Sequence, residues 1–126
     1  MNIVLWIVQV LLAAAFLAHG LFMIAPPAAM VEMINAQLGQ AFRLFIGGAE
    51  VLAAIGLILP GLTRILPGLI ALAAAGLMIV TASATVLHVS RGETSSAITT
   101  AVLFVLLTVV AYMRWKGKPI AARNMA

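Results

Sequence analysis

The stretch Phe42–Leu59, FRLFIGGAEVLAAIGLIL, is an apolar run that carries two charged side chains. A helix of about 20 residues crosses the roughly 30 Å hydrocarbon core of a bilayer. Arg43 and Glu50 are seven residues apart, so they lie on nearly the same helical face, with Gly47 between them. Charged groups at membrane depth almost always face a bundle interior or a wet cavity. Glu50 is therefore predicted to face the interior of a helix bundle.

The composition agrees with a membrane environment. Of the 126 residues, 65% are hydrophobic and 8% are charged, whereas a soluble domain has about 25% charged residues. The polar surface is too small to enclose a water-soluble core, so the bilayer is predicted to be the solvent. The chain has no cysteine, which excludes disulfide exchange and thiolate nucleophiles. Any redox role would therefore need a bound cofactor or a partner protein.

Three further apolar runs complete a set of four predicted spans, at Ile3–Ala25, Leu66–His88 and Ala97–Met113. The first run lacks a basic N-terminal region and exceeds a signal-peptide core in length, so it is interpreted as a retained span. The fold class predicted is an all-α integral membrane four-helix bundle. It forms a single domain over residues 1–126, with a basic tail from about residue 114.

Proline marks the ends of the predicted spans. Pro26 ends the first span, Pro60 ends the second, and Pro67 lies in the first turn of the third. The connector between the second and third spans is short, which predicts an antiparallel hairpin. Four spans place both termini on one side of the membrane.

The segment Ala28–Gln40 differs from the spans. Its larger apolar residues recur at helical spacing: Met30, Met33, Ile34 and Leu38. This pattern predicts a short amphipathic helix in the membrane interface, between the first and second spans. A simple connector is the alternative.

The distribution of basic residues predicts the orientation. The side with the termini holds five cations: Arg64, Arg114, Lys116, Lys118 and Arg123. The other side holds two arginines beside two glutamates. The positive-inside rule then predicts a multi-pass protein of the inner (plasma) membrane with both termini cytoplasmic. The basic tail could attract anionic lipid head groups. No nucleic-acid partner is expected, because no folded basic domain accompanies the tail.

In this topology the scarce polar residues converge on the outer half of the bundle. His19 lies roughly 9 Å and Glu50 roughly 12 Å below the outer ends of their spans. A polar stripe on the third span, including Thr81, rises to the outer loop. The predicted ligand-binding pocket consists of His19, Arg43, Glu50, Thr85 and His88, and Arg91 and Glu93 are its outer-loop neighbours.

Two interpretations of this group stay open. An ionised Glu50 has Arg43, His19 and His88 as candidate partners, and such groups could line a ligand or proton site. Alternatively, Glu50 and Arg43 form a structural pair that sets the helix register. No catalytic residue is predicted, because no serine–histidine–acid arrangement occurs. No metal site is predicted either, because the two histidines and Glu50 lack the local spacing of a metal motif.

Small residues predict close helix packing. Ala49 with Ala53, and Ala71 with Ala75, are pairs that let helix backbones approach each other in a membrane. These faces are compatible with a homo-oligomer, although four spans can also bury them within one chain.

The segment FRLFIGGAEVLAAIGLILPG resembles the hallmark of the DoxX and DoxX-like membrane protein family. That hallmark has an aromatic–arginine start, a glycine, an in-span glutamate and a Gly-Leu-x-x-Pro ending. AAFLAHGLFMI in the first span and His88 before RGE also fit. The resemblance implies a four-helix membrane bundle and a link to quinone-dependent respiratory oxidation or redox-stress complexes. Many members place a lysine after the first-span glycine, where this chain has Phe22-Met23; His19 could substitute for it.

Taken together, the leading hypothesis is an accessory or redox-linked membrane subunit. It would bind a quinone-like or other lipophilic ligand in the outer-half pocket and would have no independent catalytic activity. Its expected partners are the lipid bilayer and a membrane or redox protein. The alternatives are a non-catalytic membrane scaffold or assembly protein, and a transporter of small solutes or protons.

Overall fold

The computed structural model describes residues 2–122, which form α-helices, a short π-helix and no strand. The elements in chain order are α1 (Asn2–Ile24), α2 (Ala28–Leu38), α3 (Gln40–Thr63), α4 (Leu69–Ser90), α5 (Thr94–Tyr112) and the π-helical segment η1 (Met113–Gly117). The helices α1, α3 and α4, and α5 continued by η1, are long and apolar enough to cross a membrane. The predicted all-α bundle with four spans is confirmed.

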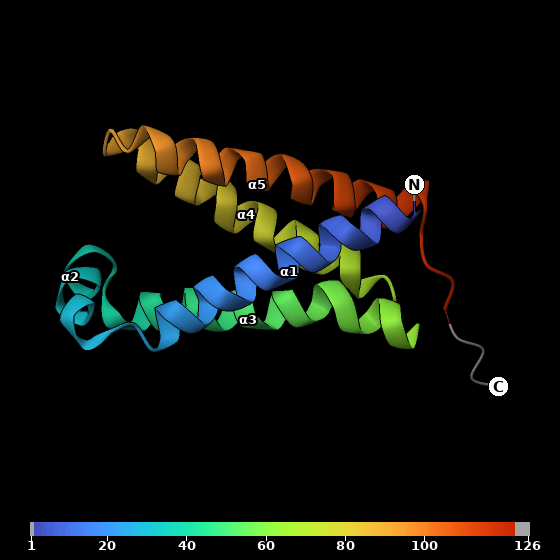
Figure 1. The fold of residues 1–126 in the computed structure, drawn as a ribbon, viewed down its shortest axis with the longest axis horizontal. Helices are drawn as coiled ribbons and strands as arrows, with labels where there is room; N and C mark the ends of the chain where they lie inside the picture. The colour runs from blue at the N-terminus through green and yellow to red at the C-terminus, as the bar shows by residue number, and fades with distance from the viewer. Residues whose placement is uncertain (1, 123–126) are drawn as a thin grey trace.

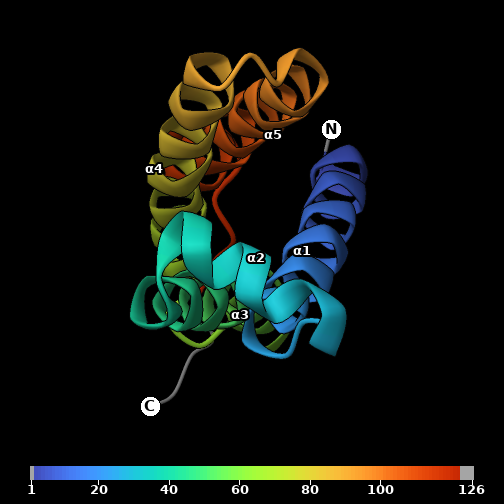
Figure 2. The same cartoon turned by 90° about the vertical axis from the view of Figure 1, so that its left-hand side faces the viewer.

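The four long helices form two pairs (Figure 1). Helix α1 packs along α3, and α4 packs along α5, while the α3–α4 hairpin joins the pairs. The pairs converge at the end that holds the N-terminus and η1, and they diverge toward the opposite end. Seen from that opposite end, α2 crosses in front of α1 and α3 (Figure 2). The divergence leaves room for a site between the pairs.

Each long helix buries a narrow stripe and exposes the rest. In α3 the buried residues repeat at spacings of three and four: Arg43, Gly47, Glu50, Ala54, Leu57, Pro60 and Gly61. This is the spacing of a helix seam that faces a bundle core. Large apolar side chains such as Leu52 and Ile79, each 71% exposed, cover the outer surface. Lipid is the solvent that suits such a surface.

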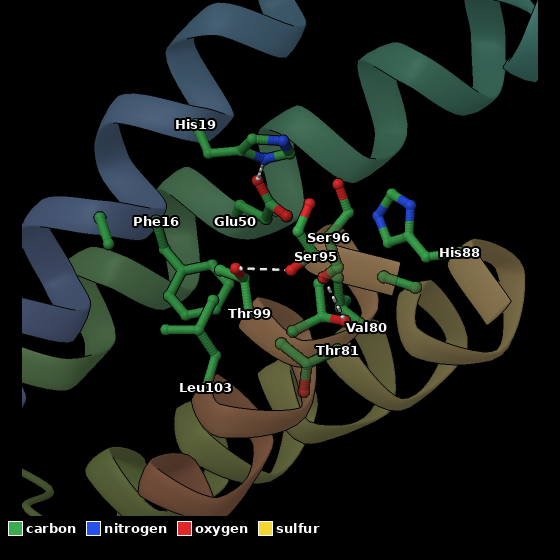
Figure 3. Close-up of a pocket in the computed structure, with 13 residues that line it drawn as sticks. Phe16, His19, Glu50, Val80, Thr81, His88, Ser95, Ser96, Thr99 and Leu103 are labelled. Atoms are coloured by element: carbon green, nitrogen blue, oxygen red, sulfur yellow. Dashed lines mark hydrogen bonds and ion pairs between the residues drawn. The ribbon is translucent and has the colours of Figure 1, made fainter. Parts of the chain in front are cut away.

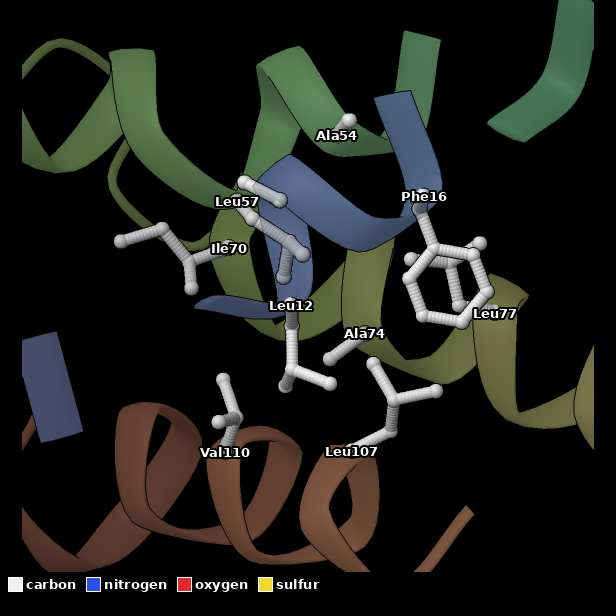
Figure 4. Close-up of a cluster of buried hydrophobic side chains, with 10 residues drawn as sticks. Leu12, Phe16, Ala54, Leu57, Ile70, Ala74, Leu77, Leu107 and Val110 are labelled. Atoms are coloured by element: carbon white, nitrogen blue, oxygen red, sulfur yellow. The ribbon is translucent and has the colours of Figure 1, made fainter. Parts of the chain in front are cut away.

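The apolar core lies where the two pairs converge (Figure 4). All four long helices contribute to it, and its buried members are Leu12, Ala13, Phe16, Ala54, Leu57, Ile70, Ala74, Leu77, Leu107 and Val110. Alanine alternates with leucine and isoleucine, which lets large side chains of one helix fill the space beside small ones of another. The core therefore closes the bundle on the side of η1, and the helix pairs separate beyond it toward α2.

Two glycines bring α1 and α3 into close contact. A Cβ atom added at Gly20 would lie 2.9 Å from the backbone oxygen of Gly47, and one added at Gly47 would lie 2.9 Å from the oxygen of Gly20. Only glycine permits this approach. The neighbouring Gly48 has open space where its Cβ would be, so only Gly47 of these two adjacent glycines is needed for the close packing of α1 and α3.

The second span differs from its prediction at its C-terminal end. It continues through the buried Pro60 to Thr63 rather than ending at the proline. Membrane helices tolerate proline where neighbouring groups hydrogen-bond to the backbone, and Gln9 of α1 donates to the carbonyl oxygen of Leu57, at 2.7 Å, in the turn before Pro60. Helix α3 then stops because Arg64 adopts a left-handed conformation, with φ of 56°.

The predicted short helix between the first two spans is present as α2. It follows the proline pair and ends at Gly39, whose φ of 82° favours glycine and whose N–H donates to the carbonyl oxygen of Asn35, at 2.7 Å. Gly39 also separates α2 from α3, so the chain turns from one helix directly into the next.

We expect Gly47→Ala to destabilise the bundle by about 1–3 kcal/mol, because its methyl group would collide with α1. Gly48→Ala should leave stability unchanged or raise it by up to about 1 kcal/mol, because alanine has the higher helix propensity. Thermal unfolding of both variants in the same detergent checks this pair. Equal losses for the two substitutions would contradict the close approach of α1 and α3.

Candidate functional site

A cavity of about 470 Å³ lies between the two helix pairs, next to the apolar core on the side where the pairs diverge. All four long helices line it (Figure 3). The residues that line it are Ala15, Phe16, His19, Glu50, Val80, Thr81, Ala84, His88, Ser95, Ser96, Thr99, Thr100 and Leu103. Apolar side chains therefore form part of the wall, and one carboxyl group, two imidazoles and several hydroxyls form the rest.

His19 and Glu50 form the closest polar contact at the cavity. Nδ1 of His19 lies 2.6 Å from Oε2 of Glu50. Glu50 is buried, whereas the His19 side chain is 55% exposed. The pair bridges α1 and α3 directly beside the Gly20–Gly47 contact, so the close approach of these helices brings the two side chains together. Because the carboxyl group engages Nδ1, it fixes the ring orientation and leaves Nε2 free for another partner.

Hydroxyl groups form the opposite side of the cavity. Thr99 and Thr100 of α5 donate to the carbonyl oxygens of Ser95 and Ser96, four residues earlier, at 3.0 and 3.2 Å. Thr81 of α4 donates to Leu77 in the same way, at 2.9 Å. A hydroxyl that donates to the backbone keeps lone pairs for accepting a second hydrogen bond. This wall is therefore suited to accept hydrogen bonds from a ligand.

The predicted pocket residues Thr85 and His88 have different positions. His88 lines the cavity, and its Nδ1 lies 2.8 Å from Oε1 of Glu93. Thr85 lies outside the lining; its hydroxyl contacts the hydroxyl of Thr100 at 2.7 Å and joins α4 to α5. Thr85 therefore supports the wall rather than facing the cavity.

Arg43 lies outside the cavity and is not paired with Glu50. Its Nη1 donates to the carbonyl oxygens of Met23 and Ile24, at 2.5 and 3.2 Å, and its Nε donates to Oδ1 of Asn35, at 2.9 Å. The last carbonyls of a helix lack partners within that helix, and α1 ends at Ile24. Arg43 supplies these missing donors, so it holds the end of α1 and α2 against α3.

The two outer-loop residues have separate partners. Arg91 donates weakly to the side-chain oxygen of Gln37 in α2, at 3.5 Å. Glu93 pairs with His88, as described above, and both lie at the mouth of the cavity, between α4 and α5. The loop thus contacts α2 and the cavity mouth through different side chains.

A second polar cluster, which the sequence did not predict, lies at the opposite end of the bundle. Arg114 is only 4% exposed; its Nε donates to Oε1 of Gln9 at 2.6 Å, and its Nη1 donates to Oδ1 of Asn2 and to the carbonyl oxygen of Lys118. Trp6 covers its guanidinium group at 5.5 Å from the ring centre. Arg114 continues the buried seam of Leu107 and Val110 at spacings of three and four. This spacing is the feature of the sequence that could have predicted that Arg114 is buried.

No three histidine, cysteine, aspartate or glutamate side chains gather within residues 2–122 closely enough to hold a metal ion. The cavity instead has one buried carboxyl group paired with one imidazole. This arrangement can hold a proton and can donate or accept hydrogen bonds at its exposed ring.

The fold and the cavity define a multi-pass helical membrane protein with a polar site between its apolar helices. Residues 7–111 match the model of the DoxX-like family, which covers most of the chain, and the protein belongs to this family. No curated protein and no solved structure matches the chain.

A double-mutant cycle tests which residue is the partner of Glu50. We expect His19→Leu and Glu50→Leu to show a coupling energy of about 0.5–3 kcal/mol, because they are in direct contact. Arg43→Leu and Glu50→Leu should be additive within about 0.5 kcal/mol, because they share no partner. Reversible unfolding in detergent of the single and double variants provides the measurement. Stronger coupling to Arg43 than to His19 would contradict the observed pairing.

Proposed function

We propose that this protein binds a lipophilic ligand with a polar ring, of the quinone type, in the cavity between the two helix pairs. The observation that carries the proposal is the His19–Glu50 pair at a cavity lined by all four membrane helices. Ionisable groups at membrane depth are costly and usually serve a function. Membership of the DoxX-like family agrees with a membrane role but does not specify a ligand.

The size and lining of the cavity suit such a ligand. Its volume of about 470 Å³ falls within the range of about 300–1,000 Å³ that is usual for small-molecule sites. Phe16 and Leu103 offer apolar contacts to a ring, and His19 stands opposite the hydroxyl wall of α5. A flat ring could therefore place one edge oxygen beside His19 and, in its reduced form, donate a hydroxyl on the other side to the threonine oxygens of α5, with apolar groups on its faces.

His19 is proposed to contact the ligand, and Glu50 to position His19. A carboxyl group on Nδ1 keeps the imidazole in one orientation, so Nε2 can donate to a carbonyl oxygen when it carries a proton and accept from a hydroxyl when it does not. A bound quinone would supply the capacity to carry electrons together with protons. His88, paired with Glu93 at the cavity mouth, is a second imidazole from which a proton could enter.

The apolar core favours binding over transport. Leu12, Leu57, Leu77 and Leu107 are each no more than 2% exposed, and they fill the bundle on the side of the cavity that faces the termini. In this conformation the described residues offer no polar route from the cavity to that end. A site that apolar packing closes toward the termini suits a ligand that does not pass through the bundle.

The biological setting follows from the same proposal. In this setting the protein would act as an accessory subunit, with a membrane or redox protein as its partner. The cations Arg64, Lys116 and Lys118 are exposed near the end that holds the termini, and this supports cytoplasmic termini in the plasma membrane.

The proposal predicts that the purified protein binds a short-tailed benzoquinone in detergent and that filling the cavity prevents binding. Ala84 lines the cavity, whereas Ala82 of the same helix is exposed outside it. Ala84→Leu should weaken binding at least tenfold, and Ala82→Leu should leave it unchanged. Glu50→Gln should weaken it about tenfold, equivalent to about 1.4 kcal/mol, because an amide holds the His19 ring less firmly than the carboxyl group does.

Equilibrium binding of the benzoquinone to the wild type and these variants gives the readout, with folding checked by helical content and size. Wild-type protein that does not bind the benzoquinone would overturn the quinone assignment, and equal binding by Ala84→Leu would overturn the site. Absence of ligand binding together with a lowered unfolding temperature for Glu50→Gln would favour the scaffold hypothesis instead.

A further inference from the structure

A second hollow lies on the outside of the bundle, between α4 and the α5–η1 helix. Its volume is about 410 Å³, and its lining is almost entirely apolar: Ala71, Leu72, Ala75, Met78, Thr108, Ala111, Tyr112 and Trp115. We call it the α4–α5 groove. It shares no residue with the cavity that holds His19 and Glu50, and the proposed function makes no use of it.

The groove has the shape and chemistry to hold a hydrocarbon chain. Small residues of α4, Ala71 and Ala75, form part of its lining together with Tyr112 and Trp115, which are 61% and 65% exposed. The Thr108 hydroxyl donates to the carbonyl oxygen of Phe104, at 2.8 Å, so its hydrogen is not free for a ligand. From Ala71 to Met78 the groove follows α4 for about 10 Å, a third of the roughly 30 Å hydrocarbon core.

Exposed cations follow the groove-lining residues closely in the sequence. Lys116 directly follows Trp115, Lys118 is two residues further on, and both side chains are exposed. Arg64, also exposed, lies in the connector that leads into α4. The three acidic residues of the chain are Glu32, Glu50 and Glu93, and none of them belongs to these segments. These segments therefore carry positive charge with no carboxylate among them.

The side chains of η1 divide between the inside and the outside of the bundle. Arg114 points into the bundle, where Gln9 and Asn2 hold it, while Trp115 and Lys116 are exposed on the outside. Nη2 of Arg114 is buried and has no hydrogen-bond partner among the described residues, so its charge lacks a paired carboxylate and adds to the positive potential. Tyrosine and tryptophan at this level also fit the depth at which lipid head groups begin.

We propose that the α4–α5 groove binds one anionic phospholipid. Part of an acyl chain lies in the groove between Ala75 and Trp115, and the phosphate group lies beside Lys116 and Lys118. An anionic head group satisfies these cations better than a zwitterionic one, because basic residues near a membrane surface attract the net negative charge of an anionic lipid. The lipid occupies an outer face of the bundle, so the site is independent of the ligand in the central cavity.

Native mass spectrometry of the full chain in neutral detergent tests this proposal, with phosphatidylglycerol and phosphatidylcholine of identical acyl chains as probes. We expect one phosphatidylglycerol to bind at least fivefold more tightly than phosphatidylcholine. The double variant Lys116→Gln/Lys118→Gln should abolish this preference. Arg91→Gln, which removes an exposed cation at the opposite end, should leave the preference intact.

The acyl-chain site has its own test. Ala75→Leu fills the groove at an exposed position and should weaken binding of both lipids at least fivefold, whereas Ala82→Leu, an exposed alanine of α4 outside the groove, should not. Equal affinity for the two lipids in the wild type would overturn the anionic site. An unchanged affinity in Ala75→Leu would overturn the groove as the place of binding. A dimer that dissociates on Ala75→Leu would also overturn the proposal, because a second copy would then occupy the groove.

Discussion

The close approach of α1 and α3 at Gly20 and Gly47 is the contact on which the candidate site depends. Each glycine leaves space that a Cβ would take from the backbone of the other helix. This spacing allows the short side chains of His19 and Glu50 to meet at 2.6 Å across the interface. In a bilayer, where water cannot solvate a carboxylate, such direct pairing makes a buried glutamate tolerable.

Arginine stabilises the bundle at both ends in a similar way. Arg43 donates to the last carbonyls of α1 and to Asn35 of α2, while Arg114 binds Gln9 and Asn2 of α1. Both arginines are buried and use neutral oxygen atoms instead of carboxylates. Between these two arginines, apolar packing closes the bundle near the termini, and the diverging helix pairs leave a cavity at the other end. The polar site is therefore confined to one half of the protein.

The sequence predicted the helices better than the partners of their polar side chains. Four spans and the short helix after the first span followed from apolar length and helical spacing, and the inward direction of Glu50 followed from the cost of its charge in lipid. The sequence left Arg43, His19 and His88 open as partners of Glu50, because two residues on one helical face can meet different neighbours; in the structure Glu50 contacts His19, and Arg43 donates to the end of α1 and to Asn35. Arg114 was assigned to a basic tail, although its spacing from Val110 continues the buried seam.

Composition and periodicity by themselves determined that this chain is an α-helical membrane protein, because hydrocarbon admits few charges and requires every backbone group to be paired. They also determined which face of α3 is buried. Only the tertiary structure decided that Glu50 meets His19 and that Arg43 caps α1, because these contacts depend on helix crossing and on two glycines far apart in the chain. It also decided that α4 and α5 leave an apolar groove beside exposed lysines, since neither helix forms that hollow alone.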